Sequence, residues 1–447
     1  MPPASSQPPL DVWAETQARH CAKKLEDAVS ATHLLKERPG FGTEVRPAKG
    51  SVVASPSSEV PDYFFHWLRD SAAVLDAVRI LIRRGENADA WMERFNDFVT
   101  FSLGLRKVSG RAFLEHNPRF RDKVTPGFLQ FVRSDEDIVS VEGDRILGEP
   151  RFNADGAFDF ICWNRPQRDG PAARALTCMR FWDDCRPDGE ARLHLKELIH
   201  RDLDYTSDNA GELSYDIWEE EWAHHYYTVL VQFAALAKGT HWAGSEVSLN
   251  CAAHYREKAL ALAELLQQFW SEEHGFIRSR LPNYGSESEK ALDFAVILGV
   301  LHAGLEGGPH SVEDTHIRAT FHKLEELFRR DYALNRGREE GFAFGRYRGD
   351  NYVSGGAYYF STFGAAEYHY RLAAAVPSES ASLIAKGDAI LSRTRDFIPA
   401  SGHLSEQFDH TTGEQTSARD LAWSYACFIT AWDARRAACA KAGRRDA

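Results

Sequence analysis

Residues 71–84, Ser71-Ala-Ala-Val-Leu-Asp-Ala-Val-Arg-Ile-Leu-Ile-Arg-Arg84, show the pattern that decides the fold. Their apolar residues recur at the spacing of one helix face, as Leu75, Val78, Leu81 and Ile82 do. The same spacing recurs to the end of the chain and predicts twelve helices, over residues 11–32, 71–84, 89–105, 171–184, 192–201, 218–238, 252–273, 288–305, 313–330, 357–375, 379–396 and 417–438. Strand signals are few and short, so the sequence predicts an all-α fold.

Twelve helices in one unbroken domain favour a ring. No change of composition marks an internal boundary, and the loops contain no long linker. Twelve helices in one unbroken domain favour helical hairpins closed into a double α-barrel. A helical solenoid would show the same local pattern, but we find no clear repeat of 30–50 residues. We expect one domain over residues 11–440, after a Pro- and Ser-rich tail over residues 1–10 that is disordered.

Composition excludes several classes of partner. The 447 residues carry a net charge of -12, which argues against nucleic acid and leaves uncharged sugars open. No apolar run reaches the roughly 18 residues of a membrane span, so we expect no membrane association. The N-terminus lacks the basic and apolar segments of a signal peptide. A cytoplasmic protein is expected, or a secreted one if a leader has been removed.

The cysteines point to the same compartment. The chain has seven, an odd number, and they are scattered without a Cys-x-x-Cys pair. A disulfide framework or a zinc site is therefore not expected, and a reducing cytoplasm fits better.

Four loops are unusually rich in Trp, Tyr, Arg, Asp and Glu, and each stands before a predicted helix. They are Pro61-Asp-Tyr-Phe-Phe-His-Trp-Leu-Arg-Asp70, Trp163-Asn-Arg-Pro-Gln-Arg-Asp-Gly170, Tyr215-Asp-Ile-Trp-Glu-Glu220 and Leu404-Ser-Glu-Gln407. The loops at one end of a helical barrel converge, so these four should build one pocket. Aromatic rings stack on sugar faces, Arg and Asp bind adjacent hydroxyls, and two carboxyls can catalyse hydrolysis of an acetal. The mixture favours a neutral sugar.

Structural interpretations of the same residues stay open. Glu219, Glu220 and Glu221 could open a helix that Asp216-x-x-Glu219 caps, and Ser417-x-x-Asp420 resembles a capping box for the last helix. Arg69-Asp70 could be a surface ion pair, and the tryptophans could belong to the core.

Other chemistries lack their motifs. There is no Gly-x-Ser-x-Gly, no phosphate-binding loop and no dinucleotide fingerprint around Gly40-Phe-Gly42. His224 and His225 would point to different faces of a helix, which argues against a metal there. We expect no cofactor and no metal ion.

Taken together, the loops resemble the glucoamylases of glycoside hydrolase family 15. The similar segments occur in the order of that family and extend over about 50 to 436. They are Val53-Ala-Ser-Pro56, Pro61–Ser71, Arg151-Phe-Asn-Ala-Asp-Gly156, Trp163–Pro171, Asp202-Leu-Asp-Tyr205, Tyr215–Glu220, Gly345-Arg-Tyr347, Leu404–Gln407 and Gly413–Tyr425.

The resemblance implies an (α/α)6 barrel that releases glucose from non-reducing ends with inversion. It implies Glu219 as general acid and Glu406 as general base, and an inverting pair stands roughly 6.5–9.5 Å apart to admit a water molecule. It further implies an α-glucan substrate and a set of substrate-binding residues, namely Tyr63, Trp67, Arg69, Asp70, Trp163, Arg165, Asp216, Trp218, Glu220, Arg346 and Trp423.

The sequence departs from that family around the pocket. Glu221-Trp-Ala-His-His-Tyr-Tyr227 replaces a Val-Asn-Gly-Ser-Ser-Phe-Phe run, and Ser354-Gly-Gly-Ala-Tyr358 replaces an Asn-Gly-Asn-Pro-Trp loop. The linkage therefore stays open between α-1,4 and α-1,6, and a trehalose hydrolase or phosphorylase of the same fold and a non-catalytic glucan-binding protein remain alternatives. We expect a monomer without a starch-binding module.

Overall fold

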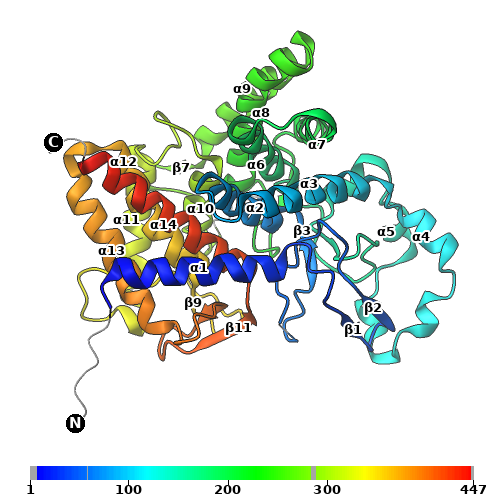
Figure 1. The fold of residues 1–447 in the computed structure, drawn as a ribbon, viewed down its shortest axis with the longest axis horizontal. Helices are drawn as coiled ribbons and strands as arrows, with labels where there is room; N and C mark the ends of the chain where they lie inside the picture. The colour runs from blue at the N-terminus through cyan, green and yellow to red at the C-terminus, as the bar shows by residue number, and fades with distance from the viewer. Residues whose placement is uncertain (1–7, 58, 283–287, 444–447) are drawn as a thin grey trace.

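The computed structural model describes residues 8–57, 59–282 and 288–443. Among them, six largely buried helices form a closed ring (Figure 1). Each contacts the next around the ring, and the last contacts the first. These inner helices are α2 (Leu68–Arg83), α6 (Gly170–Cys185), α8 (Tyr226–Glu246), α10 (Ala295–Ala303), α12 (Tyr359–Ala375) and α14 (Ala422–Gly443).

Their sequences explain the ring. Every residue of α10 from Ala295 to Leu301 is buried, and α12 is buried on nearly all sides. A helix that is apolar all round must be covered by other parts of the protein. The helix α10 packs between α8 and α12, and α12 packs between α10 and α14 with α13 outside it.

A second layer of helices covers the ring. The outer helices are α1 (Leu10–Ala28) on α14, α3 (Ala88–Gly104) on α2, α7 (Gly189–Asp208) on α6, α9 (Leu249–Leu266) on α8, and α13 (Ser380–Thr394) on α12. The sixth, α11 (Thr315–Asp331), contacts α12 through Phe321, whose ring stacks on Tyr368 with centroids 4.3 Å apart. The arrangement is the (α/α)6 barrel that was predicted.

The expectation for the N-terminal tail falls mostly outside the described residues. Residues 1–7 are not described, and α1 begins at Leu10. The disorder of the tail stays a prediction.

The predicted helix over 218–238 begins too early. The helix α8 starts at Tyr226, and the residues before it form a hairpin of β5 (Ser214–Tyr215) and β6 (Trp222–Ala223). Oδ1 of Asp216 accepts the backbone N–H of Glu220 at 2.6 Å and of Glu221 at 3.1 Å. The hairpin turn therefore satisfies these N–H groups, and neither the Asp216-x-x-Glu219 cap nor the helix opening at Glu219 is present.

The predicted start of the last helix at residue 417 is also wrong. Residues Gln415–Arg419 form β11, which pairs with β10 (Ser405–Phe408), and β10 pairs with β9 (Ala357–Tyr358). The hydroxyl of Ser417 donates to Glu406 and caps no helix. Ser417 and Asp420 both have a positive φ, which a helix cannot accommodate. Pairing with β10 overrides the helical pattern, and α14 begins at Ala422.

The other helix boundaries move by up to eight residues, the most at the C-terminal end of α8, which is Glu246 and not residue 238. The helix α10 starts at Ala295 and not at residue 288, because Oδ1 of Asp293 accepts the N–H of Ala295 at 2.7 Å.

Residues 105–148 form a lobe that the sequence did not predict. Its short helices α4 (Gly110–His116) and α5 (Asp135–Val139) lie at one side of the molecule, near β1 (Lys36–Arg38) and β2 (Thr43–Val45) and away from both termini (Figure 1). A separate apolar cluster stabilises the lobe. Elements of five to seven residues are too short to show a helical period.

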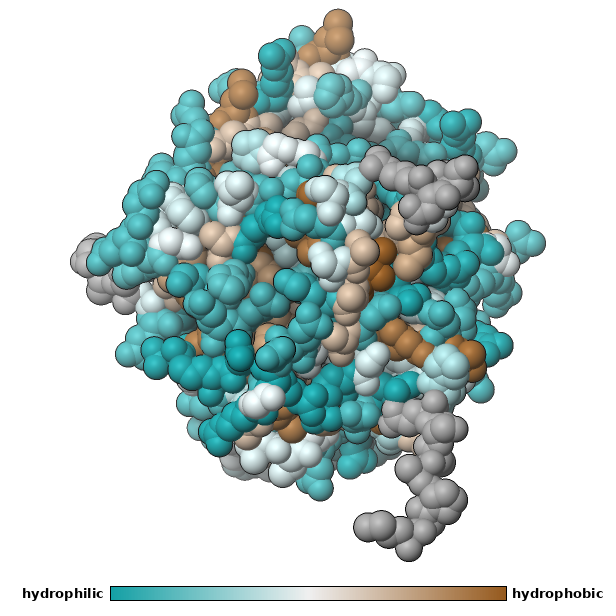
Figure 2. All heavy atoms as spheres, turned by 90° about the vertical axis from the view of Figure 1, so that its left-hand side faces the viewer, coloured by the Kyte–Doolittle hydropathy of each residue, from teal (hydrophilic) through white to brown (hydrophobic). Residues whose placement is uncertain are grey.

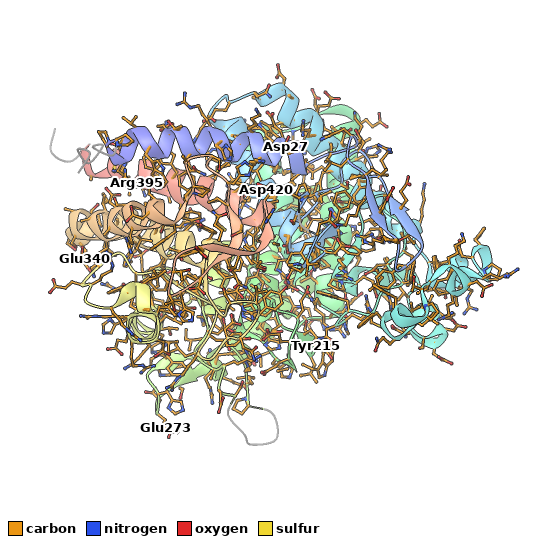
Figure 3. All side chains as sticks on the ribbon, turned by 90° about the horizontal axis from the view of Figure 1, so that it is seen from below. Asp27, Tyr215, Glu273, Glu340, Arg395 and Asp420 are labelled. Carbon is orange, nitrogen blue, oxygen red and sulfur yellow. The ribbon has the colours of Figure 1, made fainter. Side chains whose placement is uncertain are left out.

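Four of the short strands lead into inner helices at their N-terminal ends. The strand β3 (Phe65–Trp67) pairs with β4 (Arg151–Asn153) and runs directly into α2. In the same way β6 precedes α8, β9 precedes α12 and β11 precedes α14, whereas β7 (Trp270–Ser271) and β8 (Phe276–Ile277) form a separate hairpin. Figure 3 labels Tyr215 on β5 and Asp420 at the entry to α14. The four polar loops are thereby gathered at one end of the barrel.

The face shown in Figure 2 is mostly hydrophilic, and its hydrophobic residues lie in small separate patches. Within the described ranges, no helix is both long enough and apolar enough to cross a membrane.

Candidate active site

A cavity of about 450 Å³ lies at the N-terminal ends of the inner helices. Eleven of the thirteen side chains predicted for the site line it, namely Tyr63, Trp67, Arg69, Asp70, Trp163, Trp218, Glu219, Glu220, Arg346, Glu406 and Trp423. Segments from residue 54 to residue 423 meet there. Its size suits a small-molecule ligand.

Glu219 stands on the turn between β5 and β6, in a left-handed conformation with φ of 67°. The indole N–H of Trp67 donates to its Oε1 at 2.8 Å, and the indole N–H of Trp163 donates to its Oε2. The amide of Asn164 donates to its backbone carbonyl at 2.6 Å. A non-glycine residue in this conformation costs free energy, and such residues cluster at functional sites. Two indole donors therefore fix the carboxyl group at the cavity wall, and the Asn164 amide fixes the backbone that carries it.

Arg69 and Asp70 form the first turn of α2 and are almost completely buried. One guanidinium nitrogen of Arg69 lies 3.3 Å from Asp70 and another 3.2 Å from Asp169, while Glu219 is 3.7 Å away. Burial opposes the charge of Arg69, but these carboxylates hold its pKa above the ordinary value. Burial raises the pKa of Asp70 to about 6. The pair offers donors and acceptors side by side, as neighbouring sugar hydroxyls require.

Glu406 comes from β10 and is the second carboxyl group of the cavity. It is 9% exposed, and burial raises its pKa to about 7. The hydroxyl of Ser417, on the paired strand β11, donates to its Oε2 and lowers that pKa. The Ser417 hydroxyl therefore holds one oxygen of the carboxyl group, and no described residue donates a hydrogen bond to the other, which can accept one from a water molecule.

Aromatic rings form the walls between these groups. The ring of Phe360 stacks on that of Trp423, with ring centroids 4.4 Å apart. It also stacks on the ring of Trp218, with ring centroids 5.8 Å apart. The hydroxyls of Tyr63 and Tyr352 are hydrogen-bonded at 2.6 Å. Such rings bind the apolar faces of a sugar.

Glu220 and Arg346 occupy another part of the lining. A guanidinium nitrogen of Arg346 lies 3.0 Å from Oε1 of Glu220 and also pairs with Asp350 at 2.6 Å. Despite burial, these partners keep the pKa of Arg346 well above its ordinary value. Arg346 therefore keeps its positive charge at neutral pH.

Two predicted residues do not line this cavity. Arg165 pairs with Glu149 at 2.9 Å and faces a neighbouring cavity. Asp216 is buried under the Glu219 turn, where it binds the two N–H groups described above. Arg165 and Asp216 therefore lie outside the cavity lining, where they bind to the loops that carry the lining residues.

Other residues around the cavity received no role from the sequence. They include Asn164, Tyr352, Gln167, Asp169 and Ser417. Gln167 and Asp169 stood inside a conspicuous loop, which was a usable signal. Ser417 was hidden by its resemblance to a helix cap, and Tyr352 lies in a turn with no distinct pattern.

Within the described ranges, no group of three or more His, Cys, Asp or Glu side chains could hold a metal ion. The chemistry available to the cavity is that of two carboxyl groups, an arginine–aspartate pair and aromatic walls. On an (α/α)6 barrel, this combination defines a carbohydrate-active hydrolase.

Comparison with known proteins agrees. The profile described as "Glycosyl hydrolases family 15" matches residues 42–104, 102–385 and 378–433. A "Probable glucoamylase" of Schizosaccharomyces pombe is 28% identical, covering 96% of this chain and 92% of its own. The glucoamylase structures from Hypocrea jecorina and Saccharomycopsis fibuligera both superpose with a TM-score of 0.78. The Hypocrea jecorina structure is 24% identical and covers 96% of this chain and 72% of its own. The Saccharomycopsis fibuligera structure is 23% identical and covers 97% of this chain and 96% of its own.

The chain therefore belongs to the glycosyl hydrolases of family 15, and the enzyme is an exo-acting glycoside hydrolase of the glucoamylase type.

Proposed function

We propose that the protein hydrolyses the terminal α-linked glucose of a neutral glucan with inversion, releasing β-D-glucose. Glu219 is the general acid and Glu406 the general base. The observation that carries the proposal is that one cavity contains both carboxyl groups, each held by a different set of donors.

The acid step is assigned to Glu219. Its carboxyl group gives a proton to the glycosidic oxygen while the bond from that oxygen to C1 breaks. Trp67 and Trp163 hold its two oxygens, and Arg69 lies 3.7 Å from Oε1, so the residue is supported on both sides as the leaving group departs.

The base step is assigned to Glu406. Its carboxylate takes a proton from a water molecule that attacks C1 on the face opposite the leaving group. The Ser417 hydroxyl donates to Oε2, which favours the ionised form that a base requires. Oε1 is then available to the water.

Exo action follows from the closed end of the cavity. Arg69 and Asp70 are buried there, next to Trp423, whose ring lies 6.0 Å from the guanidinium carbon of Arg69. A chain continuing past the terminal glucose would meet these groups. The cavity therefore accepts a non-reducing end and not an internal segment.

The linkage is a separate part of the proposal. We favour α-1,4-linked maltooligosaccharides, as the glucoamylase names of its relatives suggest. Rates with maltose, maltotriose, isomaltose and trehalose, with and without phosphate, discriminate among the alternatives. Faster turnover of isomaltose or trehalose than of maltose would show that the enzyme prefers that other linkage. Turnover that depends on phosphate would show a phosphorylase and not a hydrolase.

We further propose a monomer in a reducing compartment. All seven cysteines lie in the described ranges and are unpaired. The hydrophilic face in Figure 2 supports a protein that needs no partner subunit there.

Substitution of the two carboxyl groups tests the assignment. General acid–base catalysis contributes on the order of 10²–10⁴-fold, so Glu219→Gln and Glu406→Gln should each lower kcat on maltose by at least about 100-fold. Glu414→Gln, in the exposed turn between β10 and β11, is the matched control and should keep wild-type kcat. Near-native turnover by either active-site variant would refute its role.

A further inference from the structure

Lys290 lies outside the cavity lining but directly against one of its residues. Its ammonium group pairs with Oε2 of Glu220 and lies 3.6 Å from Oε1 of Glu221. It also stands over the ring of Tyr347, 4.6 Å from the centroid. None of the sequence motifs includes this lysine.

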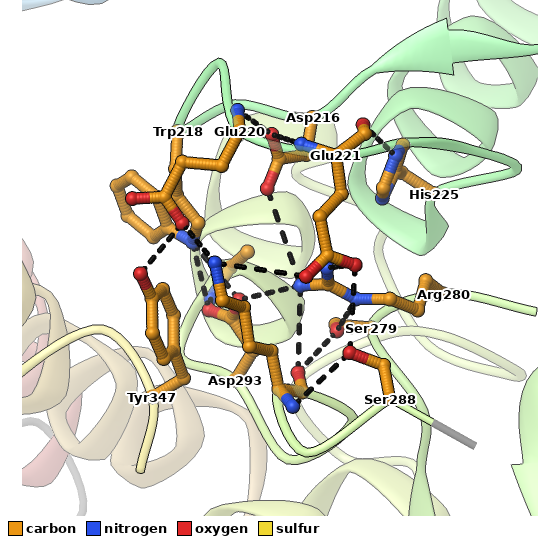
Figure 4. Close-up of polar contacts among 12 residues, drawn as sticks. Asp216, Trp218, Glu220, Glu221, His225, Ser279, Arg280, Ser288, Asp293 and Tyr347 are labelled. Atoms are coloured by element: carbon orange, nitrogen blue, oxygen red, sulfur yellow. Dashed lines mark hydrogen bonds and ion pairs between the residues drawn. The ribbon is translucent and has the colours of Figure 1, made fainter. Parts of the chain in front are cut away.

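The backbone of Lys290 is fixed. Its N–H donates to the hydroxyl of Ser288 at 3.2 Å, and its carbonyl accepts the hydroxyl of Ser279 at 2.8 Å. Arg280 stands beside it and pairs with Glu221, and it lies 3.5 Å from Asp293 (Figure 4). The lysine is therefore held in place by the protein, although its side chain is 26% exposed.

Counting hydrogen-bond acceptors shows what this contact does. A carboxylate has about four acceptor positions, two on each oxygen. On Oε2 of Glu220, Lys290 takes one position and the hydroxyl of Tyr347 takes the other at 2.5 Å. Oε1 lies 3.0 Å from a guanidinium nitrogen of Arg346, which donates its hydrogen bonds to Asp350 and to the hydroxyl of Tyr347. Among the described residues no side chain donates a hydrogen bond to Oε1, so the open acceptor positions are on the oxygen that Lys290 does not touch.

We propose that Lys290 is a positioning residue that determines specificity for the leaving group. By binding Oε2, it orients Glu220 so that Oε1 accepts a hydroxyl of the sugar next to the cleaved bond. The inference rests on the proposed function, because it assigns Glu220 to the leaving-group side of the same cavity.

The charge of Lys290 matters as well as its hydrogen bond. Glu220 and Glu221 are neighbours of like sign, and Lys290 lies between their carboxylates. Without it, repulsion would turn Glu220 away from its present orientation. A partly exposed pair contributes modestly, so we expect a loss of about fivefold in affinity for a sugar leaving group.

The test compares two substrates that differ only after the cleaved bond. The leaving group of maltose is a glucose with several hydroxyls. The leaving group of 4-nitrophenyl α-glucoside is a nitrophenyl ring, which has no sugar hydroxyls. Lys290→Met should lower kcat/KM for maltose about fivefold, mainly through KM, and change that for the nitrophenyl substrate by less than twofold. Lys290→Arg should restore most of the loss. Equal losses on both substrates, or none on maltose, would overturn the proposal.

A double-mutant cycle tests whether the effect passes through Glu220. In a Glu220→Gln background, Lys290→Met should produce no further loss on maltose, whereas independent effects would multiply and contradict the inference. Lys323→Met is the matched control, because Lys323 also pairs with a glutamate, at 3.3 Å, but stands on α11. A wild-type enzyme that cleaves neither substrate would refute the proposed function itself. An active wild-type enzyme whose variants do not show these effects would refute only the role of Lys290.

Discussion

Removing the Ser417 hydroxyl should shift the pH dependence of the reaction. Burial raises the pKa of Glu406 to about 7, and the hydrogen bond from Ser417 opposes that rise by stabilising the ionised form. In Ser417→Ala the carboxylate loses a donor, so the pKa rises further. A base must be ionised to act, and the acid side of the rate profile therefore moves to higher pH.

The size of the shift follows from the hydrogen bond. Bonds to charged groups contribute about 1.5–3 kcal/mol, and part of that remains when a water molecule replaces the hydroxyl. A remaining difference of about 1.4 kcal/mol equals one pKa unit. We therefore expect the acid-side midpoint of kcat/KM to move up by about one pH unit.

The assay is the initial rate of maltose hydrolysis at subsaturating substrate across the acid side. Ser417 has φ of 64°, so Ser417→Gly removes the hydroxyl without adding backbone strain and should show the same shift. Ser354→Ala is the control, because that hydroxyl bonds to Gln407 and Thr416. An unchanged or lowered midpoint in both Ser417 variants would refute the reasoning.

Three further predictions concern stability and the acid. The pKa of Glu406 is about 7 in the folded protein against an ordinary 4.5, so the free energy of unfolding falls as the pH rises between these values. Glu406→Gln removes this penalty, and in urea titrations it should raise the free energy of unfolding by up to about 3 kcal/mol at pH 8 and by little at pH 4. Asp202→Ala leaves the buried Arg174 without the carboxylate that lies 2.8 Å away, and should lower the free energy of unfolding by about 3–5 kcal/mol. The KM for maltose of the folded fraction should not change, and a loss of stability below about 1 kcal/mol would contradict this prediction. Trp67→Phe removes one donor to Glu219 and should reduce kcat about tenfold in initial-rate assays, and an unaltered kcat would exclude that role.

The barrel could be predicted from the sequence because its helices are long. Apolar spacing over 15 residues or more, as in α2, gives a clear period, and the almost completely apolar α10 identifies a helix that others must cover. The closure of the ring depends on contacts between α14 and α2, which are far apart in the chain. No local pattern encodes that contact, so it was inferred from the absence of a repeat and from the resemblance.

The two wrong helix starts have a shared cause. Around Glu219 and around Ser417, polar residues that resemble helix caps stand in hairpins that precede inner helices. A side-chain oxygen can satisfy backbone N–H groups in a turn as well as at a helix end, and Asp216 does so. The pairing of β10 with β11 is a tertiary effect that the spacing of residues 417–420 does not show.

The site was predictable where chemistry and position coincide. Residues such as Arg69 and Glu219 stand in short, dense loops, and the structure brings them to one cavity. Arg165 stands in the same kind of loop but turns toward Glu149, since the direction of a side chain depends on its neighbours. Lys290 lies in no dense loop, and only the fold brings it to Glu220.

The most direct test of the central claim is proton NMR of a maltose digest, recorded within the first minutes of reaction. Inversion by Glu219 and Glu406 predicts that β-glucose appears first and that the α-anomer grows later by mutarotation. Early α-glucose would contradict the inverting mechanism and the roles assigned to the two carboxyl groups.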